Sequence, residues 1–521
     1  MKTKRNIMRL ADNVQYLAAS ALVALAVSCS GDDVAGDGDT KKPENTVKTK
    51  VVTLTATVGA DTGGSSRVGM SKGEDNATAT FYWHNGDSIL VQTVSDGNVK
   101  TAKLVTEDAD GTTSATFSGD IDETAELGKY AVYPYSDTLR FTSEKSLLFT
   151  LPNTYNNYKP ESSIFSKTVD GTTVYPANST NVPLLGTIDG NKITFKHLGG
   201  LAVIRIDKMP AESGTLKITS GWNLSGNFSI SDVSAEDAAI ASNESLNTSR
   251  KTVTFNYVNA TKDAVGVFYL PLATGDYTNV TVTLSADGVE TKTASCGTLS
   301  ISRADVTSLA LYTTSKGNLI RYCGNGRYLV NGHVFVDLGT SVLWAETNVG
   351  ASSASDYGDY YAWGETSGDK YKYFYDTYKW TTDNGSTFTR YNSTDGLTTL
   401  KDEDDAACVN WGSPCRMPTK SEFDELLRCS WTQSTYGGSE VEGYTVSGKN
   451  GYSDKSIFIP FAGYYHHENL CNDGGFFLLW SSTPRTDAYS NAYVVMGFGS
   501  NHYSDNRSRW DGMSVRPVVG K

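Results

Sequence analysis

The feature that most constrains the fold of this chain is a period-two alternation of apolar and polar residues, which recurs from residue 51 to about residue 315. Residues 52–58 (VTLTATV) and 280–284 (VTVTL) are clear examples. Successive side chains of a strand point to opposite faces, so this period is typical of β-strands with one face in water. Turn signals such as Asn85-Gly86-Asp87 separate the runs at short intervals, which favours antiparallel sandwiches. We expect a mainly β protein with two tandem antiparallel β-sandwich domains, followed by an α+β module.

The first 28 residues have the pattern of a lipoprotein signal peptide. A basic start is followed by an apolar run from about residue 17 to residue 27, which ends in Ala26-Val27-Ser28-Cys29. This run is shorter than the ~20 residues that span a bilayer. We therefore expect a mature chain that begins at a lipid-modified Cys29 and is anchored to a lipid bilayer through it. Residues 29–50 are then a flexible linker with almost nothing to bury.

The residues that follow Cys29 bear on where the anchored protein faces. Ser30-Gly31-Asp32-Asp33 places two acids just after the lipid site. This stretch resembles the export tags of surface-displayed lipoproteins in Gram-negative bacteria of the gut type. The alternative is a solvated linker that happens to be acidic. We expect a protein of the cell outer membrane that is exposed at the surface.

Length, charge and motifs limit the classes of function. About 490 residues follow the leader, which is enough for about three domains. A net charge of -13 offers no basic face to a phosphate backbone, so nucleic acid is not an expected partner. The sequence contains no nucleophile elbow, phosphate-binding loop, H-E-x-x-H helix or paired C-x-x-C. We expect no enzyme, no cofactor and no metal site.

A series of short motifs gives the first two units a family resemblance. Over about 265 residues, their order and spacing resemble the fimbrillin family of the Mfa-like kind. The two fimbrillin-like sandwiches would occupy residues 51–186 and 187–316. The matching motifs are 83–89 (WHNGDSI), 117–119 (FSG), 130–135 (YAVYPY), 193–206 with His197, 269–272 (YLPL) and 275–277 (GDY).

The resemblance implies assembly with other fimbrillin subunits by strand exchange. In this scheme a protease cuts after an Arg in the first loop, the first strand leaves, and a strand of the next subunit fills the groove. Residues 51–58 would be the departing strand. Arg67, which ends the run Gly63-Gly64-Ser65-Ser66, would be the site of proteolytic processing. An ordinary turn arginine is the alternative.

Residues 317–521 have a different composition and are expected to form a separate module. The stretch beyond residue 317 holds 34 of the 57 aromatic residues and seven of the nine Trp. One helix is predicted at 419–427, where Thr419 and Glu422 have the spacing of a capping box, and a shorter one at about 404–410. Acids at 402–405 suit the start of that shorter helix better than a calcium site.

This module resembles the family called Fibrobacter succinogenes major paralogous domain, which implies a C-type-lectin-like fold. The matching motifs are 336–339 (VDLG), 342–345 (VLWA), 348–351 (NVGA), 357–365 (YGDYYAWGE), 416–419 (RMPT), 480–482 (WSS) and 514–518 (SVRPV). The tripeptides with which familiar C-type lectins bind calcium and sugar are absent, so any glycan binding is expected to be independent of calcium. Four tryptophans of the module, Trp344, Trp363, Trp411 and Trp480, are expected in its core.

Exposed aromatic rings in the late part of the module are the ligand-binding candidates. The apolar faces of a sugar stack on such rings, while neighbouring amides and acids bind the hydroxyl groups. His466 and His467 would point to opposite faces of a strand, which makes them a poor metal chelate. The candidates are Tyr464, Tyr465, His466, Asn501, Tyr503 and Trp510.

Six cysteines remain besides the lipid-bearing residue, in a compartment where disulfides can form. Their pairing does not follow from the sequence, and reduced buried thiols are the alternative. The disulfide candidates are Cys296, Cys323, Cys408, Cys415, Cys429 and Cys471.

Taken as a whole, the sequence predicts a cell-surface fimbrial subunit. A shaft subunit must donate a C-terminal strand, whereas this chain continues from the second sandwich into a folded module. Such a subunit can accept a strand but not readily donate one, so we expect a tip adhesin that binds a host or bacterial surface glycan or protein. The alternative is an unpolymerised surface lipoprotein with a binding module. A glycan-active enzyme is the third interpretation.

Overall fold

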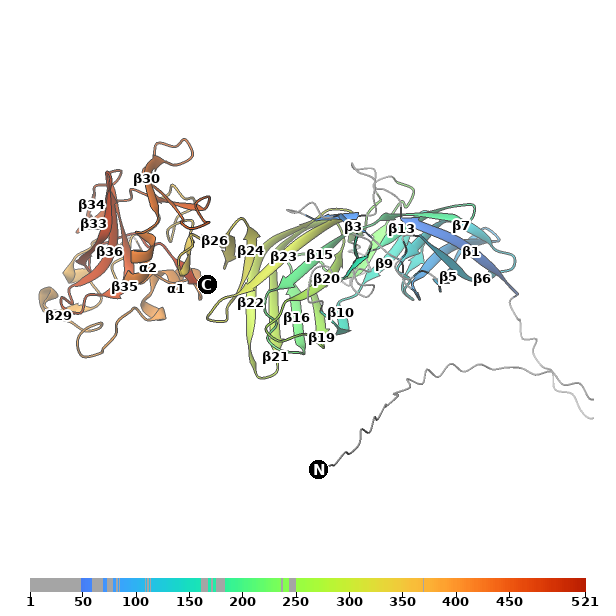
Figure 1. The fold of residues 1–521 in the computed structure, drawn as a ribbon, viewed down its shortest axis with the longest axis horizontal. Helices are drawn as coiled ribbons and strands as arrows, with labels where there is room; N and C mark the ends of the chain where they lie inside the picture. Colours follow the sequence, from blue (N-terminus) through green and yellow to red (C-terminus); the bar gives the residue numbers. More distant parts are fainter. Residues whose placement is uncertain are drawn as a thin grey trace, which may run out of the picture. The chain divides into compact units, whose positions relative to one another are not determined.

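The computed structural model describes residues 48–521 as one unit, except 59–68, 73–77, 81–82, 84, 108, 110–111, 113, 161–166, 170–171, 175–182, 236–237, 243–249 and 369 (Figure 1). The predicted lipidation site Cys29 and processing site Arg67 lie outside the described residues. Strands dominate the described part, as the alternation predicts. None of its helices combines the length and the apolar character that crossing a membrane requires.

The first group of strands closes into a barrel. Around the barrel the order is β1-β14-β13-β7-β4-β5-β6. An open two-sheet sandwich is what the sequence predicted here; closure arises because β1 pairs antiparallel with β6 and parallel with β14. The predicted boundary between residues 186 and 187 falls inside β13. The strands are β1 (Thr49–Val58), β4 (Ser88–Ser95), β5 (Asn98–Thr106), β6 (Ser114–Asp122), β7 (Glu126–Tyr133), β13 (Leu184–Asp189) and β14 (Lys192–His197).

Trp83 fills the interior of this barrel. Its ring centroid lies 5.1 Å from that of Phe117, 5.3 Å from that of Tyr133 and 5.6 Å from that of Phe195. All four rings are buried. Edge-to-face contacts of this kind favour aromatic clusters beyond the area that they bury.

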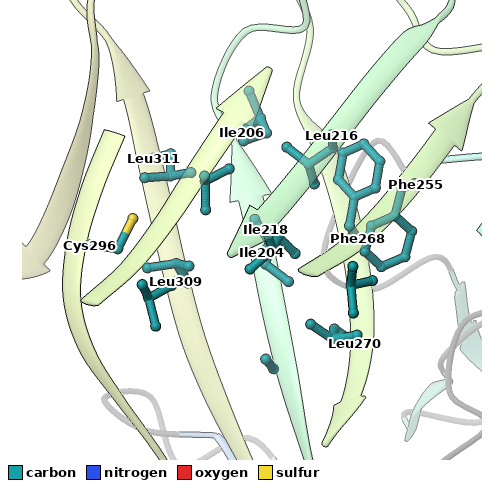
Figure 2. Packing of buried hydrophobic residues seen from close by; sticks show 14 of the residues in the cluster. Ile204, Ile206, Leu216, Ile218, Phe255, Phe268, Leu270, Cys296, Leu309 and Leu311 are labelled. Atoms are coloured by element: carbon teal, nitrogen blue, oxygen red, sulfur yellow. The ribbon is translucent and has the colours of Figure 1, made fainter. Parts of the chain in front are cut away.

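The second group of strands forms two packed sheets, as a sandwich requires. One sheet has the order β10-β19-β16-β21-β22, and the other contains β20, β15 and β23 side by side. Apolar side chains from both sheets point toward one another in a shared core, which includes Ile204, Ile218, Phe255, Phe268 and Leu309 (Figure 2). The strands are β10 (Thr154–Tyr158), β15 (Gly200–Ile206), β16 (Gly214–Thr219), β19 (Thr252–Tyr257), β20 (Gly266–Leu272), β21 (Gly275–Ala286), β22 (Val289–Ile301) and β23 (Asp305–Thr313).

The sheet that contains β23 continues into the C-terminal part of the chain. On one side of β23 the order is β24-β25-β26-β27-β38, and on the other it is β2-β3-β12-β11. β38 pairs antiparallel with β27, so the C-terminal strand lies beside an early strand of the aromatic module. The strands are β2 (Gly69–Lys72), β3 (Thr78–Thr80), β11 (Lys167–Val169), β12 (Thr172–Val174), β24 (Leu319–Gly324), β25 (Arg327–Val330), β26 (His333–Val336), β27 (Val342–Ala345) and β38 (Val518–Gly520).

A smaller sheet of order β18-β17-β9-β8 completes the N-terminal part. Its strands are β8 (Arg140–Phe141), β9 (Leu147–Leu151), β17 (Gly226–Ile230) and β18 (Ala241–Ser242).

The aromatic module combines small antiparallel sheets with two short helices. Both predicted helices are confirmed, α1 (Ala406–Trp411) and α2 (Lys420–Leu426), and α2 has the predicted capping box between Thr419 and Glu422. The four tryptophans expected in the core are buried. The remaining elements are η2 (Tyr375–Thr377), β28 (Thr381–Thr382), η3 (Asp383–Gly385), β29 (Thr387–Phe388), η4 (Asp402–Asp404), β30 (Ser430–Thr435), β31 (Glu442–Ser447), β32 (Ser456–Pro460), β33 (Tyr464–His466), β34 (Asn469–Cys471), β35 (Phe476–Pro484), β36 (Asn491–Phe498) and β37 (Asn501–Ser508).

Asp405 caps α1, which confirms the capping interpretation of the acidic run. Its Oδ1 accepts hydrogen bonds from the amides of Ala407 and Cys408, at 2.9 and 3.0 Å. Its Oδ2 accepts one from the amide of Met417, at 2.8 Å. Burial raises the pKa of this carboxyl to about 6, although the three amide hydrogen bonds and Arg416 lower it. The cap therefore joins the start of α1 to the segment that leads into α2.

We expect this carboxyl to make the free energy of unfolding depend on pH. Below pH ~4 both states of the protein hold the proton, whereas between about pH 4 and pH 6 only the native state keeps it. The free energy of unfolding should therefore fall by roughly 2–3 kcal/mol as the pH rises from 4 to 7. Asn is also a good N-cap, so Asp405→Asn should remove this contribution and keep the cap on α1. Urea unfolding of both proteins from pH 4 to 7 measures the difference, and parallel pH profiles would contradict the prediction.

Candidate ligand-binding site

The six predicted ligand residues divide into two groups with different surroundings. Tyr464, Tyr465 and His466 form β33, and neighbouring side chains of a strand point to opposite faces. Tyr465 packs inward, with its ring centroid 4.9 Å from that of Tyr360 and 5.4 Å from that of Tyr373. Its backbone exchanges two hydrogen bonds with Gly512. Tyr465 therefore supports the site rather than facing a ligand.

Trp510 belongs to the same inner cluster. Its ring is stacked at 6.4 Å from that of Phe388 and lies 6.2 Å from that of Tyr375. The indole is half-buried against this aromatic cluster, which also contains Tyr360, Tyr373 and Tyr378. The structure thus assigns Trp510 to packing, like Tyr465.

His466 faces outward and forms an ion-pair geometry with Asp511. Its Nδ1 lies 2.9 Å from Oδ1 of Asp511, and its side chain is 48% exposed whereas the carboxylate is buried. Burial raises the pKa of the Asp511 carboxyl, while His466 and the nearby Arg507 act in the opposite direction. The pair places an orientated imidazole at the protein surface.

β37 supplies the second outward group. Asn501, Tyr503, Asp505 and Arg507 alternate along this strand and therefore share one face. The Tyr503 side chain is 41% exposed and its ring lies 6.4 Å from that of Phe498, which is 40% exposed. The backbone carbonyl of Asn501 accepts a hydrogen bond from the Tyr444 hydroxyl at 3.2 Å.

Two phenylalanines connect the groups into what we call the aromatic row, Tyr464, Phe476, Phe498 and Tyr503. The Tyr464 and Phe476 rings are 5.8 Å apart, and Phe476 lies opposite Phe498 in the pairing of β35 with β36. Burial raises the pKa of Tyr464, the neighbouring Cys471 and Asp511 add to this, and Arg507 acts in the opposite direction. The aromatic row therefore combines ring faces with charged and hydrogen-bonding groups beside it, which suits a polar ligand with an apolar face.

The sequence analysis missed four residues of this surface, Phe476, Phe498, Arg507 and Asp511. The alternation along residues 501–507 could have revealed Arg507, since it shares a face with Tyr503. The others become neighbours only through strand pairing. Among the described residues, no group of three or more His, Cys, Asp or Glu side chains has a metal-binding arrangement.

All six disulfide candidates are free thiols in this structure. Burial raises the pKa of Cys296 and Cys415 to about 12 and that of Cys408 to about 11. A raised pKa keeps a thiol protonated, and the protonated form is the unreactive one. Cys323 is exposed, whereas Cys429 is buried and Cys471 is half-buried.

No family model matches the chain, and no curated protein matches it in sequence. Solved structures do resemble it. A candidate cell adhesion protein of Bacteroides ovatus aligns at a TM-score of 0.32 and 12% identity, over 53% of this chain and 96% of its own. The fimbrial anchor protein Mfa2 of Porphyromonas gingivalis aligns at 0.22 and 9%, over 55% and 99%. The tip fimbrial protein Mfa3 of the same organism, with a C-terminal truncation, aligns at 0.24 and 11%, over 52% and 99%.

Proposed function

We propose that this protein is a cell-surface fimbrial subunit of the fimbrillin, Mfa-like kind that assembles by strand exchange and acts as a tip adhesin. The observation that carries the proposal is the position of β1. This strand pairs with β6 from Thr49 to Thr57 and with β14 from Thr55 to Val58. It is the first strand of the described chain, and its pairing with β6 and β14 closes the barrel.

β1 has the properties of a replaceable strand. Leu54 and Ala56 are buried in the barrel, Val52 is half-buried, and Val51 is 71% exposed. A strand that buries few side chains and makes many backbone hydrogen bonds can be replaced by another strand with a similar alternation of apolar and polar residues. This is because main-chain pairing does not depend on sequence. Loss of β1 would leave the edges of β6 and β14 open to a strand from another subunit.

β23, the last strand of the sandwich, is poorly suited to leave as a donor. It pairs in parallel with β15 over Leu201–Ile206, in parallel with β2, and antiparallel with β24. Withdrawing it would break pairing on both of its sides. A subunit that accepts a strand and does not donate one belongs at the end of a fibre, which supports the tip position.

The proposed binding module is the part from 317 to 521, in the C-type-lectin-like manner of the Fibrobacter succinogenes major paralogous family. The exposed residues His466, Asn501 and Tyr503, with the half-buried Tyr464 beside them, are the ligand-facing candidates, and a host or bacterial surface glycan or protein is the partner. Other fimbrillin subunits bind at the barrel. Before assembly the lipid on Cys29 would anchor the precursor in the outer membrane, and the proposed activity is binding without catalysis.

The test is the N-terminal residue of protein recovered from the cell surface, measured by mass spectrometry on sheared fibres and on membranes. A start at Val68 in the fibre fraction is expected, because cleavage after Arg67 would release β1. Arg67→Gln should abolish this start and the incorporation into fibres, whereas Arg140→Gln, a matched change at an exposed arginine on β8, should not. A lipidated Cys29 start found only in membranes would contradict assembly and favour the unpolymerised surface lipoprotein.

A further inference from the structure

We propose that a groove between the β30–β32 sheet and the segment after β27 binds a single neutral sugar residue. This groove, the Tyr436 groove, has a volume of about 190 Å³. It lies on strands other than those of the aromatic row, and the sequence analysis did not identify it. The inference rests on the proposed role of residues 317–521 as a binding module and names its ligand class. Its lining includes Arg327, Glu346, Tyr436, Thr445, Ser456 and Phe458.

The groove offers an aromatic surface for a sugar ring. Tyr436 is 38% exposed at the end of the β30–β31 hairpin, and its ring lies 5.2 Å from that of the buried Phe458. Two backbone hydrogen bonds hold the residue, from its own amide to Val441 and from the amide of Ser439 to its carbonyl. The apolar C–H face of a pyranose stacks on such a ring, while the hydroxyl groups of the sugar form hydrogen bonds with neighbouring polar groups.

Hydroxyl groups line the groove beside the aromatic rings, on the same β30–β32 sheet as Phe458. Thr445 is half-buried, and its Oγ1 lies 2.8 Å from Oγ of Ser434, where either atom can donate. Ser456 is exposed at the start of β32. A hydroxyl is both donor and acceptor, so these groups match the hydroxyls of a sugar in either role.

The charges of the groove favour a neutral ligand. The Arg327 guanidinium and the Glu346 carboxylate form an ion pair, with 44% and 26% of their side chains exposed. They are the two charged residues that line the groove, and their charges balance. Neutral hydroxyls can donate to the carboxylate and accept from the guanidinium, whereas the carboxylate of an acidic sugar would have to displace Glu346 from Arg327.

A buried arginine holds the two walls of the groove in place. Nη1 of Arg516 donates to the backbone carbonyl of Glu346 at 2.9 Å, and its Nη2 donates to the carbonyl of Phe458 at 3.0 Å. The guanidinium is fully buried, and these contacts fix the segment of Glu346 relative to the strand of Phe458. When a site is already formed before the ligand arrives, binding costs less free energy because fewer protein groups have to be ordered.

The size of the groove limits the ligand to one ring. Pockets for drug-sized ligands measure about 300–1,000 Å³, and this groove falls below that range. It is also open at the surface, so the rest of a glycan can extend into solvent from the bound residue. A terminal neutral sugar of a surface glycan fits these limits.

The test is saturation-transfer NMR on the full chain with four separate probes: the methyl glycosides of galactose, mannose, N-acetylglucosamine and glucuronic acid. We expect transfer to at least one neutral glycoside and none to the glucuronide. Tyr436→Ala and Ser456→Val should each weaken binding of that glycoside about tenfold or more, because they remove the ring surface or a hydroxyl partner. Tyr371→Ala, which removes a tyrosine that is 82% exposed and belongs to neither the groove nor the aromatic row, is the matched control and should bind within about twofold. Circular dichroism of each variant shows whether it is folded.

Three results would overturn this inference. One is the absence of transfer to every neutral glycoside, and another is transfer to the glucuronide alone. The third is binding that survives Tyr436→Ala and Ser456→Val but disappears in Tyr503→Ala, which would make the aromatic row the sugar site. None of these results changes the N-terminal residue found in fibres, so failure of the groove and failure of the proposed fimbrial role are distinguishable.

Discussion

A chain that begins at Val68 is expected to lose the closed barrel, and a synthetic peptide with the sequence of β1, Thr49–Val58, is expected to restore it. Removing β1 exposes the socket of Leu54, and burying a Leu side chain contributes ~1.5–3 kcal/mol. It also removes the backbone pairing with β6 and β14, in which each hydrogen bond contributes a net ~0.5–1.5 kcal/mol. We expect a loss of more than ~5 kcal/mol, comparable to the whole stability of a small domain. Thermal unfolding with and without the peptide measures this.

The peptide experiment has an internal control. Leu54 is 1% exposed and Val51 is 71% exposed on the same strand. A peptide with Leu54→Asp should fail to restore the barrel, because it would bury a carboxylate, whereas a peptide with Val51→Asp should restore it. Equal rescue by both peptides would contradict insertion in the observed register. A chain from Val68 that is as stable as the full chain would remove the physical basis of strand exchange.

Arg516→Met is expected to destabilise the aromatic module by at least ~4 kcal/mol. The guanidinium is fully buried and donates to Oδ1 of Asn348 at 2.8 Å and to the carbonyls of Ala345, Glu346 and Phe458 at 2.9–3.1 Å. Methionine fills most of the volume but donates to none of these oxygens. Each buried acceptor left without a partner costs ~1–3 kcal/mol. Urea unfolding of the full chain, followed by tryptophan fluorescence, reports on this loss because most tryptophans lie in the module.

The matched control is Arg485→Met. Arg485 is partly exposed and forms an ion pair with the exposed Asp487. Surface ion pairs contribute little, so this variant should change the free energy of unfolding by less than about 1 kcal/mol. If both variants were equally stable, the four hydrogen bonds of Arg516 would not be what holds the segments of Asn348, Glu346 and Phe458 together. The Tyr436 groove would then lack its proposed support.

Local features of the sequence predicted local structure well. The alternation at 52–58 corresponds to β1, and the capping box at Thr419 and Glu422 starts α2 where the spacing places it. Asp405 caps α1 because a short acidic side chain just before a helix reaches its free amides. The buried tryptophans follow from their apolar neighbours. In each case the interacting residues are within a few positions of one another.

The candidate site shows where such prediction fails. His466 and Tyr503 do face outward, whereas Tyr465 and Trp510 pack against Tyr360 and Phe388. Tyr464 is half-buried against the core of the module. The residue types alone do not distinguish these two outcomes, because exposed and packed tyrosines carry the same side chain. Asp511 becomes the partner of His466 through a contact over 45 positions.

The sequence by itself determined that the described chain is mainly β and where its capped helices begin. Tertiary structure alone decided that β1 closes a barrel, that the aromatic row crosses two sheets, and that Tyr436 and Glu346 line one groove. The physical reason is the range of the interactions. Alternation and capping depend on neighbours in the chain, whereas strand partners and groove walls depend on which distant segments bury their apolar faces together.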